Sequence, residues 1–296
     1  MGKRQRGIRG PGGGGAKPAA EEAVKIAPNM SKLPRKKMYR ARAHSNPLSD
    51  QIFDIPEDPN AVDWASLYPS FFPQADQAAP AAASEQPSTS GQGEQPLVRF
   101  ADIGCGFGGL LIRLSPLYPD TLMVGMELRS KVSEYVKERI ASLRLEHPGQ
   151  YGNVSCVRTN AMKYLPHYFR KGQLTKMFFL FPDPHFKTAN HRRRIINTTL
   201  VTEYAHLLAV GGMLYTITDV PELGEWMRSK LDTHPLFERV SDEELESDPA
   251  AGLLTQASEE GQKVARNQGS THRAVYRRLA SPRPLEANPE KLASRR

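Results

Sequence analysis

The chain has 296 residues, with 40 Lys or Arg against 32 Asp or Glu and a formal net charge of +8. Its apolar runs fall short of the roughly 18 residues that a membrane-spanning helix needs, and its first residues lack the apolar stretch of a secretory signal. The two cysteines, Cys105 and Cys156, have no metal-site spacing, so we expect no disulfide framework, no metal site and a reducing, intracellular compartment.

The net charge is distributed unevenly along the chain. Residues 1–42 carry +10, residues 43–98 carry −8 without a single Lys or Arg, and residues 99–296 carry +6. Residues 1–30 are rich in Gly, Pro, Ala and basic side chains, which predicts a disordered basic arm. Basic runs are typical both of RNA contact and of a nuclear address, and composition does not separate the two. We expect a nuclear protein, with the cytoplasm as a second location.

Three more segments follow the basic arm. The segment 31–72 contains a cluster of large aromatic residues, Trp64, Tyr68, Phe71 and Phe72. This cluster predicts that 31–72 docks on a folded domain. Residues 73–96 are rich in Ala, Pro and Ser and predict a flexible linker. The folded domain is expected over 97–280, and residues 281–296 are expected to form a disordered tail.

From Leu97 on, short apolar strands alternate with amphipathic helices. The expected strands are Leu97–Ile103, Thr121–Met126, Val154–Arg158, Lys176–Phe181, Met213–Thr218, Phe237–Val240 and Ala274–Leu279. The expected helices cover residues 110–114, 132–143 and 191–209. Such alternation predicts an α/β fold: a doubly wound, mostly parallel sheet with helices on both faces.

A glycine-rich turn follows the first expected strand. Gly104, Gly106 and Gly109 match the pattern GxGxxG between a strand and a helix. Glycines there allow a tight turn and let a ligand approach the backbone. Glu127 ends the second strand, where a carboxylate can accept hydrogen bonds from both hydroxyls of a ribose. Taken alone, the pattern also suits a tight turn with packing glycines.

Asp102 distinguishes two classes of ligand for this turn. A dinucleotide would bring a pyrophosphate to the N-terminus of the following helix, and Asp102 would oppose that charge. The methionyl ammonium group of S-adenosylmethionine (SAM) would instead be attracted by Asp102. The pattern therefore favours a SAM-dependent methyltransferase over an NAD-dependent dehydrogenase, with capping of a turn as the alternative role of Asp102.

A second candidate site follows the fourth strand. Asp183 stands between Pro182 and Pro184, at the strand end where open parallel sheets bind ligands. The prolines restrict the backbone, which suits a carboxylate that must be held in one geometry. A solvated Asp in a Pro-Asp-Pro turn is the alternative interpretation.

A run of basic residues comes next. They are Lys187, His191, Arg192, Arg193 and Arg194. The sequence places them at the start of the helix expected over 191–209, where the helix macrodipole disfavours positive charge. They are therefore predicted to bind nucleic-acid phosphates, with a solvated basic face as the alternative.

Several motifs together resemble one family. In chain order they are ADIGCGFGG, MELRSKV, TNAM, FFLFPDPHFK, GGMLYTITDV and SEEGQKVARN. From about Lys36 to Leu279, apart from the linker, the chain resembles the catalytic subunit of eukaryotic tRNA (guanine-N7-)-methyltransferases, which are Rossmann-like class I SAM-dependent enzymes. The resemblance implies methyl transfer from SAM to N7 of a guanosine in the tRNA variable loop. It also implies a heterodimer with a non-catalytic WD-repeat β-propeller subunit.

The resemblance further implies roles for single residues. Asp183 falls on the catalytic position. SAM contacts are implied for Gly104, Glu127, Arg129, Asn160, Ala161 and Leu180. Ser258 stands where the family usually has Thr, and it joins Glu260 as a further candidate for SAM binding. From the glycine motif we add Asp102 and Gly106, and for RNA binding Arg266 joins Lys187, Arg192, Arg193 and Arg194.

Other functions remain open at this stage. A dehydrogenase is disfavoured because no hydride-transfer constellation is evident. A methyltransferase acting on a small molecule or a protein would have no evident use for the basic arm, whereas one acting on another RNA would. A non-catalytic RNA-binding scaffold is disfavoured by the presence of Gly104, Glu127 and Asp183.

Overall fold

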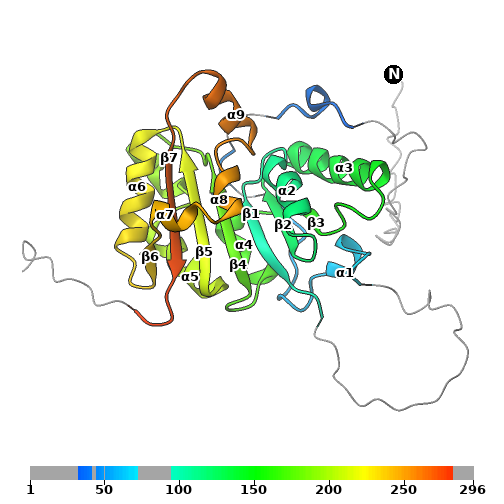
Figure 1. The fold of residues 1–296 in the computed structure, drawn as a ribbon, viewed down its shortest axis with the longest axis horizontal. Coiled ribbons are helices and arrows are strands. Elements are labelled where there is room, and N and C mark those ends of the chain that lie inside the picture. Colours follow the sequence, from blue (N-terminus) through cyan, green and yellow to red (C-terminus); the bar gives the residue numbers. More distant parts are fainter. Residues whose placement is uncertain (1–32, 42–44, 50, 73–94, 283–296) are drawn as a thin grey trace, which may run out of the picture.

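The computed structural model describes residues 33–41, 45–49, 51–72 and 95–282 (Figure 1). The basic arm predicted over 1–30 lies outside these ranges, as do almost all of the predicted linker and tail. Within the described ranges, no helix is long and apolar enough to cross a membrane.

A seven-stranded sheet forms the centre of the molecule, in the order β3-β2-β1-β4-β5-β7-β6 (Figure 1). The strands are β1 Val98–Ile103, β2 Leu122–Glu127, β3 Val154–Arg158, β4 Leu174–Leu180, β5 Leu208–Thr218, β6 Phe237–Arg239 and β7 His272–Arg278. Strands β1 to β5 pair in parallel, whereas β7 runs antiparallel to β5 and β6. The prediction of a mostly parallel sheet is confirmed.

Helices cover both faces of this sheet, so the fold is doubly wound. One face packs against α4 (Ala161–Tyr168), α5 (Thr198–Leu207) and α6 (Pro221–Asp232). The other packs against α2 (Gly109–Leu114), α3 (Ser130–Glu146), α7 (Asp242–Leu245) and α8 (Pro249–Leu253). Side chains alternate between the two faces along a strand, so neighbouring residues pack into different cores. Phe100 lies in one core, and Ala101 and Ile103 lie in the other.

The segment before the sheet contributes to the core. Its short helix α1 (Trp64–Leu67) places Trp64 against Phe169, with ring centroids 6.2 Å apart. Tyr68 is fully buried, and its hydroxyl donates to the Met123 carbonyl at 2.9 Å. Phe71 and Phe72 pack against the same core. The aromatic cluster is therefore one wall of the α4–α6 core in this structure.

Three short 3-10 helices and one further α-helix complete the described structure. They are η1 (Lys36–Tyr39), η3 (Ser115–Leu117), η4 (Thr188–Arg193) and α9 (Glu259–Arg266). The η1 segment lies across α3 and α9: Lys36 forms an ion pair with Glu259, and the Tyr39 hydroxyl donates to Glu138.

The helix predicted over 191–209 is wrong in its first third. Residues 188–193 form η4, the non-helical residues 194–197 follow, and α5 begins only at Thr198. The Asn197 side chain fixes that start, because it accepts a hydrogen bond from the Leu200 amide at 3.0 Å. The basic run therefore does not lie at the N-terminus of an α-helix, and the macrodipole argument does not apply to it.

Candidate active site

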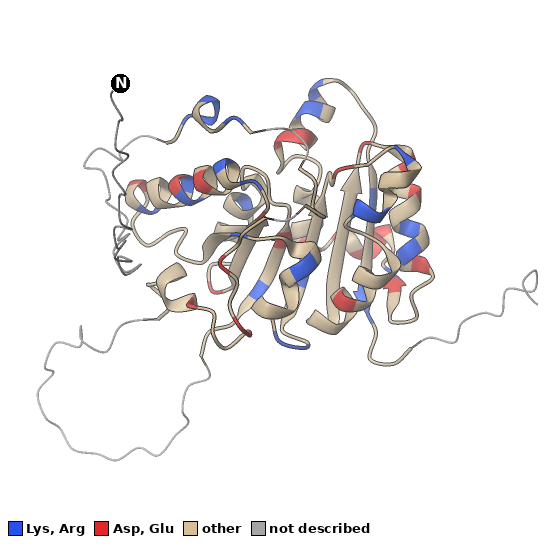
Figure 2. Ribbon diagram, turned by 180° about the vertical axis from the view of Figure 1, so that it is seen from behind, with Lys and Arg blue, Asp and Glu red and all other residues tan. Residues whose placement is uncertain are grey.

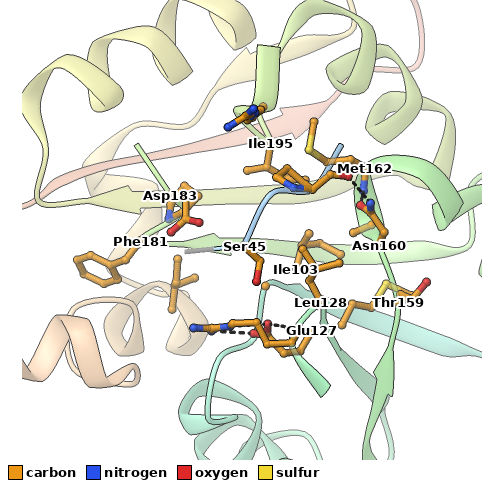
Figure 3. A pocket seen from close by; sticks show the side chains of 18 of the residues that line it. Ser45, Ile103, Glu127, Leu128, Thr159, Asn160, Met162, Phe181, Asp183 and Ile195 are labelled. Carbon is orange, nitrogen blue, oxygen red and sulfur yellow. Dashed lines mark hydrogen bonds and ion pairs between the residues drawn. The ribbon is translucent and has the colours of Figure 1, made fainter. Parts of the chain in front are cut away.

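A cavity of about 820 Å³, counted out to its open mouth, lies at the carboxyl ends of the central strands (Figure 3). Strands β1 and β4 are neighbours in the sheet. From β1 the chain continues to β2 on one side, and from β4 it continues to β5 on the other side, so the carboxyl ends of β1 and β4 form the crevice expected in a doubly wound sheet. The cavity is lined by Ser45, Pro47, Ile103, Gly104, Met126, Glu127, Leu128, Arg129, Thr159, Asn160, Ala161, Met162, Leu180, Phe181, Pro182, Asp183, His185, Arg193 and Ile195.

About half of the predicted site residues meet in this cavity. Those that line it are Gly104, Glu127, Arg129, Asn160, Ala161, Leu180, Asp183 and Arg193. The predicted residues outside its lining are Asp102, Gly106, Lys187, Arg192, Arg194, Ser258, Glu260 and Arg266. Residues distant in the sequence are thus brought together by the strand order.

The glycine turn after β1 is open to a ligand. Gly104 has φ +74° and Gly106 has φ +54°, a left-handed conformation that glycine adopts without a steric penalty. A Cβ atom at either position would have no heavy atom within 4 Å. The amides of Gly104 and Cys105 donate to the Met126 carbonyl at 2.8 and 3.1 Å, which fixes the turn against the end of β2.

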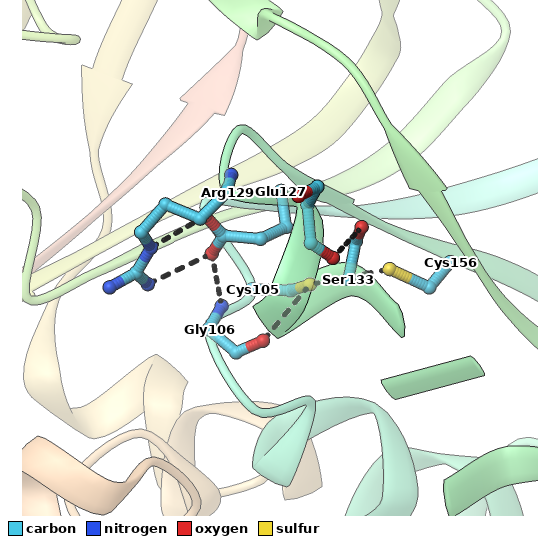
Figure 4. Close-up of polar contacts among 7 residues, drawn as sticks. Cys105, Gly106, Glu127, Arg129, Ser133 and Cys156 are labelled. Atoms are coloured by element: carbon cyan, nitrogen blue, oxygen red, sulfur yellow. Dashed lines mark hydrogen bonds and ion pairs between the residues drawn. The ribbon is translucent and has the colours of Figure 1, made fainter. Parts of the chain in front are cut away.

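Glu127 is buried at the end of β2 and is held on both carboxylate oxygens (Figure 4). Its Oε2 accepts from the Gly106 amide at 3.1 Å and from Arg129 Nη2 at 3.1 Å. Its Oε1 accepts from the Arg129 amide at 3.0 Å and from Arg129 Nε at 2.9 Å. The hydrogen bond to Glu127 raises the pKa of Arg129 despite its partial burial, and the charge of Asp183 adds to this effect. A ribose that reaches Glu127 must therefore share its oxygens with Arg129 or displace that side chain.

Asn160 joins α4 to the N-terminal segment. Its Oδ1 accepts from the Met162 amide at 3.0 Å and caps α4, while its Nδ2 donates to the Pro47 carbonyl at 2.6 Å. This contact brings Ser45 and Pro47 to the cavity wall. The sequence predicted docking of this segment but gave no signal that it reaches the cavity, because its partner lies 113 positions away.

Asp102 lies on β1, is only 3% exposed and does not line the cavity. Burial, followed by the charges of Glu127 and Glu259, raises its pKa to about 8. The carboxyl group is therefore mostly protonated near neutral pH in this structure. A cation placed beside it would favour the charged form.

The turn that carries Asp183 is strained on both sides. Phe181 has φ +48° and His185 has φ +45°, a region that costs a residue with a Cβ about 1–2 kcal/mol. The Phe181 amide donates to the Ile217 carbonyl at 2.8 Å, which fixes the beginning of the turn. Figure 3 shows Phe181 and Asp183 toward one end of the cavity, and Thr159 and Asn160 toward the other. Asn160, one of the cofactor candidates, thus lies toward the end opposite the predicted catalytic carboxylate.

The structure corrects the prediction that Arg194 contacts RNA. Arg194 is only 1% exposed, donates from Nε to the Pro184 carbonyl at 2.9 Å, and pairs through Nη2 with Glu222 at 2.7 Å. A side chain committed to internal partners in this way is not available to an external phosphate. By contrast, Lys187 and Arg192 are exposed, and Arg193 is half-buried on the cavity wall.

The candidates on α9 have local roles in the helix. Ser258 caps α9 by accepting from the Gly261 amide at 3.0 Å, and Glu260 pairs with Lys263 at 3.5 Å. Arg266 is exposed in the last turn, and its Nε donates to the Gln262 carbonyl at 3.3 Å. Figure 2 shows α9 acidic at its start and basic at its end, which complements the macrodipole. Contact of these residues with SAM or RNA stays a prediction.

The residues present suit SAM. Gly104 and Gly106 leave room for a ligand along the backbone, and Glu127 offers a fixed carboxylate. Arg193 Nε is buried without a hydrogen-bond partner among the described residues, although its side chain borders the cavity. Such a donor suits an anionic group, either the methionyl carboxylate or an RNA phosphate.

Residues 96–274 match a family model described as a putative methyltransferase. A tRNA (guanine-N(7)-)-methyltransferase of Oryza sativa subsp. indica is 60% identical over 251 residues, which cover 85% of this chain and 93% of that protein. The protein of the same name from Arabidopsis thaliana is 61% identical over 84% of this chain and 93% of its own length. That from Mus musculus is 53% identical over 84% of this chain and 92% of its own length.

Proposed function

This chain belongs to the family of tRNA (guanine-N(7)-)-methyltransferases, and from that premise we propose how its cavity serves the reaction. The reaction transfers the methyl group of SAM to N7 of a guanosine in tRNA. The observation that carries the assignment to this cavity is that Gly104, Glu127 and Asp183, from three strand ends, line the same crevice.

SAM, when bound, supplies a methyl group on a positively charged sulfur. Gly104, Glu127 and Asn160 are the residues that would hold it, and Asp102 on β1, in its charged form, would favour its ammonium group. Asp183, toward the end of the cavity opposite Asn160, then faces the guanine.

Asp183 acts in this proposal as a fixed hydrogen-bond acceptor. Guanine N7 already carries an in-plane lone pair, so the chain needs no general base to remove a proton first. As the purine becomes positive, its N1–H and amino groups become stronger donors. The Asp183 carboxylate, accepting from that edge, stabilises the transition state more than the ground state.

The guanosine must be turned out of a folded RNA to reach the cavity, and this requires phosphate contacts outside it. The exposed Lys187 and Arg192 follow the Asp183 turn directly, and Arg193 borders the cavity. We assign the contacts with tRNA phosphates to these residues and to Arg266. The variable loop as target, a WD-repeat β-propeller subunit as partner and a nuclear location complete the proposal, on the strength of the sequence resemblance and the basic arm.

Methyl transfer from labelled SAM to a tRNA pool tests this function. The modified position is mapped by cleavage at N7-methylguanosine, with and without the WD-repeat subunit. We expect label at one guanosine in the variable loop, and labelling slower by roughly 10²- to 10³-fold with Asp183→Asn. Label found only in another RNA, or in a small molecule, would contradict the proposed substrate.

A further inference from the structure

We infer that Arg194 is a positioning residue that holds the Asp183 turn in place through the Pro184 carbonyl. Glu222 and Trp226 of α6 in turn fix the position of the Arg194 side chain. The inference rests on the proposed function, because it presupposes that Asp183 serves the reaction.

Arg194 connects the turn to α6 by two hydrogen bonds. Its Nε donates to the carbonyl of Pro184, the residue that follows Asp183, at 2.9 Å. Its Nη2 pairs with Glu222 in the first turn of α6 at 2.7 Å. The guanidinium is almost fully buried, whereas the Glu222 side chain is 60% exposed. One buried side chain therefore links the backbone of the catalytic turn to a helix outside the cavity.

Trp226 fixes the position of that guanidinium. Arg194 Cζ lies 4.7 Å from the centroid of the indole, a cation–π contact. The indole Nε1 donates to the Ile196 carbonyl at 2.7 Å, and the His191 ring meets the indole edge-on at 5.2 Å. The chain on both sides of Arg194 is thus fastened to the same side chain of α6.

The backbone of the Asp183 turn needs stabilising contacts from outside the turn. Phe181 and His185 both adopt left-handed backbone conformations that their side chains disfavour, so the local sequence does not stabilise this geometry by itself. The charge-assisted bond from Arg194 acts on Pro184, between the two ends of the strained stretch.

Only an arginine makes these three contacts together. Its Nε and Nη2 diverge toward two acceptors while its plane lies on the indole, whereas a lysine ammonium is a single point donor. Burial of this charge is costly, and Arg194 Nη1 has no partner among the described residues. A buried ion pair is weak evidence of added stability, so its geometric effect on Asp183 is the better explanation.

Arg194→Lys and Arg194→Met test the inference. We expect kcat for tRNA methylation to fall by roughly 10- to 100-fold, because small displacements of a catalytic group cost about that much. The Kd for SAM and the KM for tRNA should stay within about twofold. In an Asp183→Asn background, Arg194→Met should lower kcat no further, since its effect acts through Asp183.

Helix α6 offers a second test variant and a matched control. The test variant Glu222→Gln weakens the ion pair with Arg194 from the solvent side and should keep the fold even if the Arg194 variants do not. It should lower kcat about three- to tenfold, and again not in the Asp183→Asn background. Glu225→Gln, which removes a similarly exposed carboxylate that pairs with Arg228 at 2.5 Å, should leave kcat unchanged.

Two results would overturn the inference while the proposed function stands. One is a loss from Glu222→Gln that adds fully to that of Asp183→Asn; the other is an unchanged kcat in both Arg194→Met and Glu222→Gln. Wild-type protein that forms no N7-methylguanosine would instead refute the proposed function, and this inference with it.

Discussion

Two turns follow neighbouring strands and enter the same cavity, yet they are built in opposite ways. The turn after β1 reaches left-handed conformations with Gly104 and Gly106 and leaves the space above them open. The turn after β4 reaches the same region with Phe181 and His185, which both carry large side chains.

The difference shows what each turn is for. A turn built on glycines lets a ligand contact the backbone, and hydrogen bonds to Met126 and Glu127 hold it. A turn that presents side chains such as Asp183 must hold them still despite strain, so it depends on a distant anchor, Arg194. Substitutions should therefore affect binding and stability at the first turn, and turnover at the second.

Asp183→Asn tests that separation most strongly. Loss of the acceptor charge should lower turnover by roughly 10²- to 10³-fold, the usual effect of removing one group that stabilises transition-state charge. Calorimetry should show SAM affinity within about twofold of wild type, and Asp120→Asn at an exposed site should change neither quantity. Abolished SAM binding would move Asp183 to the cofactor end and remove the distinction.

Asp102 predicts how stability depends on pH at the first turn. Its pKa is about 8 in the folded protein against an ordinary value of 3.8, so the unfolded chain loses this proton first as pH rises. Asp102 contributes fully to the free energy of unfolding below about pH 4. This contribution falls between about pH 4 and pH 8, by at most about 1.4 kcal/mol per pH unit. In cofactor-free protein, Asp102→Asn should remove this fall in urea unfolding curves. Parallel curves for the two proteins from pH 5 to 7.5 would contradict the raised pKa.

Gly109 tests how closely the first turn is packed. A Cβ there would lie 2.1 Å from the Ala257 carbonyl oxygen, so Gly109→Ala should cost about 1–3 kcal/mol of unfolding free energy. Gly252 on α8 has open space, and Gly252→Ala should instead be neutral or stabilising by up to about 1 kcal/mol. Thermal or urea unfolding compares the two, and equal effects would refute the packing argument.

The basic residues after the second turn should show the smallest effect. The double substitution Lys187→Ala, Arg192→Ala removes two exposed charges and should reduce the slope of log affinity for tRNA against log salt by about 1.4. Arg194→Met should leave the slope unchanged because its charge is buried. A reduced slope in the Arg194 variant alone would return that residue to the RNA surface.

The central parallel strands were predictable because they contain short apolar runs, as in Lys176–Phe181, and burial on both faces of the sheet favours such runs. The meeting of Gly104, Glu127 and Asp183 in one crevice followed from the general behaviour of open parallel sheets, whereas the order of the strands was not predicted. Helices with polar sequences, such as α6 and α9, were missed because they bury only a narrow stripe of side chains.

Other details depend on contacts between distant residues. Arg194 has the same chemistry as its exposed neighbour Arg192, and only α6 decides that one is buried. The role of Asn160 in holding Pro47 likewise has no local signature. Sequence patterns identify which residues carry chemistry, whereas tertiary packing decides which of them face the ligand.

The burial of Trp64 and Tyr68 also constrains how the protein is made. The ribosome synthesises both residues before any strand of the sheet, yet the Tyr68 hydroxyl bonds to Met123, 55 positions later. During synthesis these two aromatic side chains can contact each other, but their partners in the core, Met123 and Phe169, emerge only later. The nascent chain therefore exposes this hydrophobic segment for several seconds at usual elongation rates, which makes it prone to non-native contacts during synthesis.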